Sequence, residues 1–314
     1  MTALGFYNGQ FVQLDSLQVP IEERGHQFGD GVYEYVQIYG GRPFLLQAHL
    51  KRLERSLVAI GIPNPYSAEE WTQLINEAVR RSGESEAAVY WQVTRGVAPR
   101  VHVFSNTLRP MVSLTVHPRV GQESTHEMSL LAWPDERWTH VWVKTINLLP
   151  NILAKEMAKR NGANEALLVR EGRVTEGGSS NVWFVFKQTL YTAPANRYIL
   201  NGITRQFVLK LAAHLNIPVA EEPVDWQRVP DADEVFVTSS SAEVTGVSKI
   251  LVDRQVEGAL HSVPPGIPGT LLPELKNIRT VWTGTCPGTV TQRLQQAFSE
   301  QLQQLRDAVP AELL

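Results

Sequence analysis

The chain has 314 residues, of which 43% are hydrophobic and 19% charged, and its formal net charge is −3. This composition is typical of a soluble globular protein, and the near balance of charge gives no electrostatic reason to expect nucleic acid or an anionic membrane as a partner. A single cysteine, Cys286, excludes a disulfide within the chain. The start of the chain shows no secretory signal, and no apolar run approaches a membrane span, so we expect a cytoplasmic protein.

The first part of the chain alternates strand and helix patterns. Asn8-Gly9 between apolar and aromatic flanks predicts a hairpin, and Gly40-Gly41 predicts a turn after a strand rich in β-branched and aromatic residues. Ser67 and Glu70 form a capping-box pattern that predicts a helix start. The expected elements are a hairpin over 4–14, a strand over 32–39 with its return over 43–46, helices over 50–60 and from 68, and strands over 87–96 and 110–117. We therefore expect a mostly antiparallel sheet covered by helices.

The pattern lapses around residues 118–124, and we place a domain boundary there. The predicted division is an N-terminal domain over 1–118, a linker over 119–124 and a C-terminal domain over 125–314. In the second domain we expect strands over 128–133, 142–147, 165–170, 173–175, 182–186 and 234–238, and helices over 150–160, from 204 and around 294–305. Residues 262–289 are rich in Pro, Gly and Thr and are expected to form a long excursion. The fold class is therefore α+β.

Lys144 lies in an otherwise uncharged run from Val141 to Leu149. A lysine in a strand usually lies on a solvated face, but the period of two puts Lys144 on the same face as Trp142. Desolvation lowers the pKa of a lysine and frees its amine to attack an aldehyde carbon, which a Schiff base to pyridoxal phosphate requires. Glu176 ends a predicted strand, and its carboxylate could keep the nitrogen of a pyridine ring protonated.

Two further patterns suggest anion binding. Residues 201–204 open a helix and offer backbone N–H groups to a phosphate, and the serines at 239–241 follow a strand and offer hydroxyls. Arg100 and His102 would share a face in an extended segment, and an arginine fork is a natural partner for a carboxylate; the alternative is a basic surface loop. The sequence contains no metal-binding spacing of His and Cys, no Walker loop, no dinucleotide-binding glycine pattern and no hydrolase elbow.

Together these motifs resemble the class IV, or fold-type IV, pyridoxal-phosphate enzymes. The most specific pieces are VKTINLLPNILAK and NEALLVREGRVTEGGSSNVWFV, supported by RGHQFGDGVYE, HLKRL, YILNGITR and EVFVTSSSAEVT. The resemblance covers nearly the whole chain from Phe6 to about Val256 and resumes in the final helix. It implies two domains, a smaller N-terminal α/β domain and a larger C-terminal domain with a β-barrel-like core, with pyridoxal 5′-phosphate at their interface.

The resemblance also implies roles for individual residues. Lys144 would bind the cofactor covalently, and Glu176 would pair with its pyridine nitrogen. The cofactor phosphate would be held by Arg52, Ile203, Thr204 and Ser240. VYWQVTRGVAPRVH is similar to the D-amino-acid aminotransferases, in which the substrate carboxylate is held by residues that correspond here to Tyr33, Arg100 and His102. The arginine and histidine would reach in from the neighbouring subunit, which implies a homodimer.

The expected reaction moves an amino group between a D-amino acid such as D-alanine and a 2-oxo acid such as 2-oxoglutarate or pyruvate. Alternatives on the same fold are an L-branched-chain aminotransferase, an (R)-amine transaminase and aminodeoxychorismate lyase. Arg100 and His102 argue against the first, and an amine offers them no carboxylate. A pyridoxal-phosphate-binding interaction protein without catalysis is the alternative from another class. Two features depart from the D-specific pattern: Gly178 replaces a frequent serine, and residues 262–289 have no counterpart.

Overall fold

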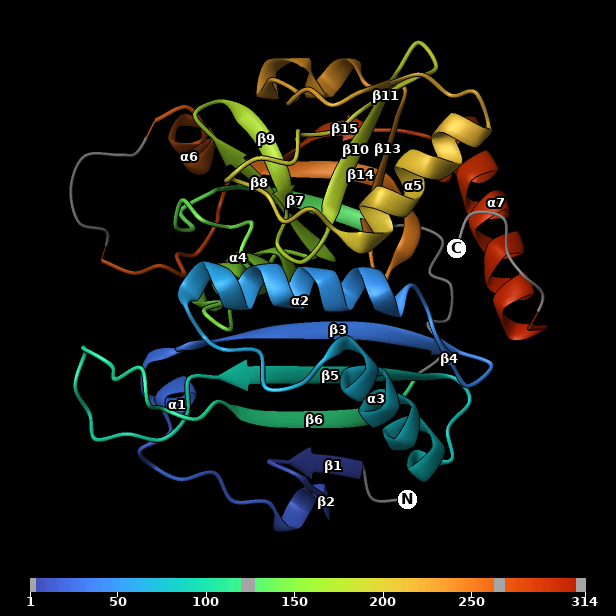
Figure 1. Ribbon diagram of the computed structural model, residues 1–314. Helices are drawn as coiled ribbons and strands as arrows, with labels where there is room; N and C mark the ends of the chain where they lie inside the picture. The colour runs from blue at the N-terminus through green and yellow to red at the C-terminus, as the bar shows by residue number, and fades with distance from the viewer. Residues whose placement is uncertain (1–3, 120–127, 263–268, 309–314) are drawn as a thin grey trace.

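The N-terminal part of the computed structural model is a six-stranded antiparallel sheet (Figure 1). The structure describes residues 4–119, 128–262 and 269–308. The strands lie in the order β2-β1-β6-β5-β3-β4. Their bounds are β1 (Leu4–Tyr7), β2 (Gln10–Gln13), β3 (Gly31–Tyr39), β4 (Arg42–Pro43), β5 (Ala87–Thr94) and β6 (Met111–Pro118). Asn8 and Gly9 join β1 to β2 with φ values of 43° and 97°, the left-handed conformation that a two-residue hairpin turn needs, so the predicted hairpin is confirmed.

Helices α2 (Leu46–Ile60) and α3 (Ala68–Ser82) pack against this sheet. Their buried side chains, Leu53 and Trp71 among them, form one core with the inward residues of β3, β5 and β6. Ser67 caps α3 through the predicted reciprocal bonds with Glu70. A short helix, α1 (Arg24–Phe28), precedes β3, and a 3-10 turn, η1 (Leu14–Ser16), follows β2.

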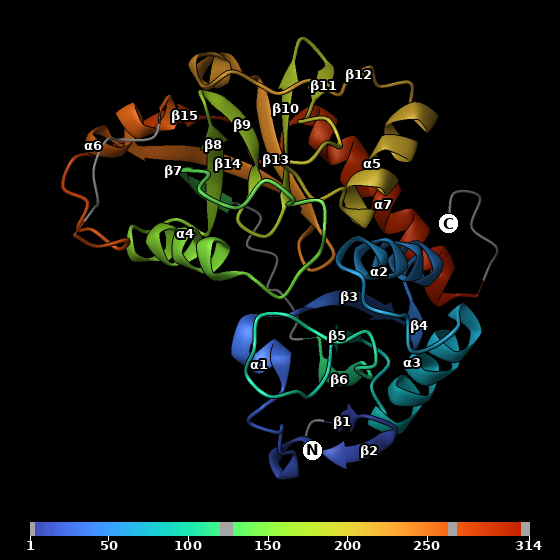
Figure 2. The ribbon, with the colours of Figure 1, turned by 60° about the vertical axis from the view of Figure 1, so that its left-hand side comes forward.

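The C-terminal part is built on a second, mixed sheet. Its strands lie in the order β12-β11-β10-β13-β14-β7-β8-β9, with β15 paired to β14. Their bounds are β7 (Met128–Pro134), β8 (Glu165–Arg170), β9 (Arg173–Gly177), β10 (Asn181–Phe186), β11 (Thr189–Tyr191), β12 (Val219–Ala220), β13 (Glu234–Ser239), β14 (Glu243–Asp253) and β15 (Ile278–Thr283). β9 stands at one end of this order yet also contacts β10, so the sheet curls around its core (Figure 2). This matches the predicted β-barrel-like core.

The helices of the C-terminal part cover the outside of the curled sheet. These elements are α4 (Leu149–Arg160), α5 (Ile203–His214), α6 (Arg254–Glu257) and α7 (Thr289–Arg306), with 3-10 turns η2 (Trp226–Asp231) and η3 (Gly258–Leu260). α4 packs on β7 and β8, while α5 and α7 pack on β13 and on each other. Phe207 of α5 and Phe298 of α7 meet Phe44 of the N-terminal part, with ring centroids 5.3 to 5.5 Å apart. One apolar core therefore joins the two parts.

Three sequence expectations need correction or restriction. The strand predicted over 142–147 is wrong: the segment is irregular, because its backbone bonds to the start of β3 and to side chains. β14 was not predicted, and within the expected excursion over 262–289 the structure forms β15, which pairs with β14. The predicted linker over 119–124 lies outside the described residues except for Arg119, so the domain limits stay a prediction.

The shared aromatic core gives a stability prediction. Phe298 is 3% exposed and contacts both Phe44 and Phe207. Phe298→Ala should lower the free energy of unfolding by about 3 to 5 kcal/mol, because it removes a buried ring and leaves a cavity. The measurement is urea unfolding. Ser299→Ala, at an exposed position of the same helix, is the control and should stay within about 0.5 kcal/mol of wild type. An equal loss in the two variants would contradict this account.

Candidate active site

A cavity of about 540 Å³ lies where the two parts of the chain meet. We call it the Lys144 cavity. Seven of the nine residues singled out from the sequence line its wall: Tyr33, Arg52, Lys144, Glu176, Ile203, Thr204 and Ser240. They come from strands, helix ends and loops far apart in the sequence, so only the folded chain brings them together.

Backbone bonds to the start of β3 position Lys144. The Tyr33 N–H donates to the Lys144 carbonyl at 3.0 Å, and the Ile146 N–H donates to the Gly31 carbonyl at 3.1 Å. The Lys144 N–H in turn donates to Ser56 Oγ at 3.2 Å. The side chain is half-buried, and its Nζ lies 4.1 Å from the centre of the Tyr33 ring. The strand expected around Lys144 is absent, yet its amine reaches the cavity beside an aromatic face.

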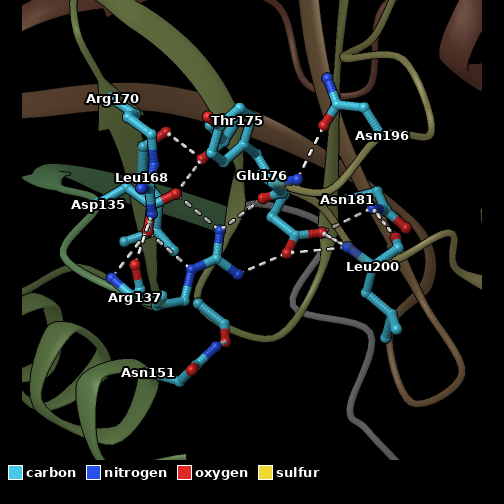
Figure 3. Close-up of polar contacts among 12 residues, drawn as sticks. Asp135, Arg137, Asn151, Leu168, Arg170, Thr175, Glu176, Asn181, Asn196 and Leu200 are labelled. Atoms are coloured by element: carbon cyan, nitrogen blue, oxygen red, sulfur yellow. Dashed lines mark hydrogen bonds and ion pairs between the residues drawn. The ribbon is translucent and has the colours of Figure 1, made fainter. Parts of the chain in front are cut away.

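Glu176 lies in β9 as a buried carboxylate with three donor residues (Figure 3). Arg137 Nη1 donates to Oε1 at 2.5 Å, Asn181 Nδ2 donates to Oε2 at 2.9 Å, and the Leu200 N–H lies 3.1 to 3.2 Å from both oxygens. Burial raises the pKa of Glu176 to about 7, against the lowering effect of Arg137. The site therefore holds a carboxylate that gains from a positive charge in the adjoining cavity.

A buried charge network lies behind Glu176. Asp135 accepts from Arg137 Nε at 2.8 Å and Nη2 at 2.9 Å, and Arg170 lies 3.1 Å from the same carboxylate (Figure 3). Burial would raise the pKa of Asp135, but Arg137 and Arg170 outweigh it and hold that pKa below its ordinary value. Asp135, Arg137 and Asn181 were not singled out from the sequence. Two opposite charges soon after the strand over 128–133 were the only local signal, and such pairs are common in surface turns.

The start of α5 faces the cavity as an anion-binding corner. Gly202 is the N-cap, makes no side-chain capping bond, and is followed by Ile203 and Thr204 with no acidic residue in the first turn. A Cβ at Gly202 would collide with Asn181 Oδ1, so glycine permits this close approach. Backbone N–H groups of a first helical turn and the helix dipole favour an anion here. Ser240 lines the same cavity.

Arg52 is fixed beside this corner by a fully buried acid. Its Nε and Nη2 donate to Glu34 at 2.7 and 2.8 Å, and His49 Nδ1 lies 2.7 Å from the same carboxylate. Burial would raise the pKa of Glu34, but Arg52 and His49 outweigh it, so the pKa lies well below the ordinary value. The carboxylate thus stays charged and orients Arg52 toward the cavity.

Gly178, the departure from the expected serine, lies under Lys155. A Cβ at position 178 would meet Lys155 Cγ at 2.7 Å and Glu165 Oε1 at 2.8 Å. Lys155 Nζ donates to Ser179 Oγ at 2.7 Å, and Ser179 Oγ donates to Glu165 Oε2 at 2.7 Å. The glycine therefore makes room for a polar network on the cavity wall.

Arg100 and His102 do not line the Lys144 cavity. Both are exposed on the irregular loop between β5 and β6, where Arg100 lies 5.2 Å from the centre of the Phe28 ring. His102 lines a neighbouring cavity of about 300 Å³, which shares Trp138, Thr145 and Asn147 with the first. Within one chain, the two residues are therefore separate from the seven that surround Lys144.

Neither a metal cluster nor a membrane span is found in the part of the chain that the structure describes. No group of three or more His, Cys, Asp or Glu side chains in it is placed to hold a metal ion. Over the same ranges, no helix has the length and apolar character needed to cross a membrane.

Comparisons with known proteins agree with one another. A family profile described as amino-transferase class IV matches residues 31–250. D-alanine aminotransferase from Bacillus licheniformis is 39% identical over 276 residues, which are 87% of this chain and 94% of that protein. The branched-chain aminotransferase of Thermoproteus uzoniensis, solved with norvaline, has a TM-score of 0.79 at 25% identity and covers 96% of this chain and 95% of that chain. A second branched-chain amino acid aminotransferase, from the source abbreviated T.th. and solved with pyridoxamine 5′-phosphate, has a TM-score of 0.74 at 25% identity, covering 96% and 94%.

The raised pKa of Glu176 gives a pH prediction for the cofactor-free protein. Folding takes up a proton between the ordinary value of 4.5 and the folded value of about 7. The free energy of unfolding should therefore fall as the pH rises through this window, and Glu176→Gln should remove that part of the dependence. Urea unfolding of wild type and variant from about pH 5 to about pH 7.5 measures the difference. Parallel curves for the two proteins would show that Glu176 does not titrate in this window.

Proposed function

Because the chain belongs to the class IV aminotransferases, we propose that it moves amino groups between D-amino acids, such as D-alanine, and 2-oxo acids, such as 2-oxoglutarate or pyruvate. The observation that carries this choice is the 39% identity to a D-alanine aminotransferase along nearly the whole of both proteins. The gathering of Lys144, Glu176 and an anion-binding corner in one cavity supports it. The single cysteine and balanced charge of the chain favour the cytoplasm as its location.

The cavity residues fit pyridoxal phosphate, the cofactor of this class. The hydroxyl of Ser180 is buried on the cavity wall and has no hydrogen-bond partner among the described residues, so it is available to a ligand. Glu176 would face the ring nitrogen. The phosphate would be held by Arg52, Ile203, Thr204 and Ser240. The T.th. enzyme, which shares the fold, was solved with the aminated form of this cofactor.

The chain's own residues provide attachment, charge and proton transfer. When bound, pyridoxal phosphate supplies an aldehyde carbon that takes up the amino group and a ring that withdraws electrons from the substrate Cα–H bond. Lys144 Nζ binds that carbon, and once substrate has displaced it, Nζ accepts the Cα proton as a general base. Glu176, with Arg137 and Asn181 fixing both its oxygens, keeps a proton on the ring nitrogen. The Tyr33 ring centre lies 4.1 Å from Nζ and limits where the amine can move.

Recognition of the substrate carboxylate is assigned to Tyr33, Arg100 and His102. Since Arg100 and His102 lie off the Lys144 cavity of their own chain, the proposal places them at the cavity of a second subunit in a homodimer. Large apolar side chains are exposed both on their loop, where Val103 is 82% exposed, and on the cavity wall, at Trp138 and Ile152. Contact between two copies would remove this apolar surface from water.

An L-branched-chain aminotransferase is the second candidate. The solved structures that resemble the chain include branched-chain enzymes with TM-scores of 0.74 to 0.80. Their identities of 23 to 25% are well below the 39% shared with the D-alanine enzyme. The fold is therefore common to both, and the substrate hand needs a direct test.

The stereochemical prediction compares D-alanine with L-leucine, each with 2-oxoglutarate. The kcat/KM for D-alanine, measured from the 2-oxo acid formed, should exceed that for L-leucine by at least about 100-fold, because the carboxylate site fixes one hand of the substrate. Lys144→Ala should lose activity by several orders of magnitude, while Lys159→Ala, in an exposed position of α4, should keep it. A preference for L-leucine would assign the chain to the branched-chain enzymes.

The subunit prediction uses a mixed dimer of Lys144→Ala and Arg100→Ala chains. In a hybrid, the intact Lys144 of one chain would meet the intact Arg100 of the other and restore one site. Subunits that exchange at random should give about a quarter of wild-type activity, since about half of the dimers are hybrids with one complete site. Each variant measured alone is the control. A mixture no more active than the average of the two variants would place Arg100 at the cavity of its own chain.

A further inference from the structure

We propose that Arg24 is a positioning residue for the carboxylate-binding loop, holding the backbone on which Arg100 and His102 are mounted. This inference rests on the proposed function, which gives those two residues their role. Arg24 lies in α1 and does not line the Lys144 cavity, and none of its hydrogen bonds goes to a residue assigned to the cofactor. Its effect would therefore act on the substrate carboxylate alone.

The guanidinium of Arg24 is buried and binds the loop at two successive carbonyls. Nη1 donates to the Val101 carbonyl at 2.7 Å, and Nη2 donates to the His102 carbonyl at 3.3 Å. Nε donates to Asp30 at 2.8 Å, which fixes the plane of the fork. Side-chain exposure is 4% for Arg24. A planar fork with three directed donors holds a backbone more rigidly than a single ammonium could.

Arg95 doubles this anchor at the base of the loop. Its Nε donates to the same Asp30 carboxylate at 2.9 Å, and its Nη atoms donate to the carbonyls of Gly61 and Ile60. The Phe104 ring lies over both arginines, at 3.6 Å from Arg95 Cζ and 5.8 Å from Arg24 Cζ. Two guanidinium groups on one carboxylate also leave positive charge beneath the loop, which favours an approaching carboxylate.

The loop needs such an anchor because little else fixes its exposed stretch. It runs from 95 to 110 without helix or strand, and its base is closed where Gly96, at a φ of 108°, packs against the Arg109 carbonyl. Within it, the Val101 N–H bonds locally to the Pro99 carbonyl. An arginine fork binds a carboxylate only in a defined orientation, and displacement of a binding group by about 1 Å can cost about 100-fold in rate.

The test compares carboxylate-dependent with carboxylate-independent measurements on the holoenzyme. The probes are the KM for D-alanine, the inhibition constant of propionate, the single-turnover rate with D-alaninol, which has no carboxylate, and the affinity for pyridoxal phosphate. Arg24→Lys should raise the first two constants about tenfold, because it breaks charged hydrogen bonds to the loop. The D-alaninol rate and the cofactor affinity should stay at wild-type values. Arg80→Lys, an exposed pair with Glu77, is the control and should change nothing.

Separate outcomes identify which claim fails. If Arg24→Lys leaves the propionate constant unchanged, or slows D-alaninol by the same factor as D-alanine, the positioning role is wrong while the proposed function stands. If Arg100→Ala itself leaves the propionate constant unchanged, the carboxylate site of the proposed function fails and the inference fails with it. Should Arg24→Lys not fold, Phe104→Leu at an exposed site decides instead. It should raise the propionate constant about threefold, and no rise would overturn the inference.

Discussion

The site depends on a short antiparallel contact between the start of β3 and the irregular segment around Lys144. Val32 forms a bridge with Thr145, and two backbone bonds flank it. This contact joins the N-terminal sheet to the C-terminal part at the point where Tyr33 and Lys144 face each other. Gly31 makes the approach possible, since a Cβ there would lie 2.8 Å from the Val93 carbonyl and 3.2 Å from Ile146 Cδ1. Without this contact, the two parts would have no common cavity.

Local sequence rules predicted the elements whose causes are local. The Asn8-Gly9 hairpin and the Ser67 cap follow from turn and helix-end chemistry, and both are present. The segment over 142–147 failed because its alternation of apolar residues suggested a ladder, whereas its partners are the start of β3 and the Ser56 hydroxyl. β15 was hidden in a Pro- and Gly-rich stretch, because its pairing with β14 depends on a partner distant in the sequence.

The candidate site divides in the same way. Lys144, Glu176 and the start of α5 carry recognisable motifs, so the sequence was enough to select them. Asp135 and Arg137 matter because they are buried together behind Glu176, and burial of a charged pair is a property of the fold. Arg24 likewise belongs to the recognisable segment RGHQFGDGVYE, but its bonds to the carbonyls of residues 101 and 102 depend on a distance that no sequence period encodes.

The closed base of the loop between β5 and β6 has an evolutionary consequence. The close packing of Gly96 against the Arg109 carbonyl lets β5 and β6 pair in full register whatever lies between them. Residues beyond this point can be exchanged as a cassette, while the sheet, the cofactor residues and their charge network keep their geometry. A lineage on this scaffold can therefore acquire a new substrate preference by rewriting one exposed loop, without rebuilding the chemistry that the other side chains perform.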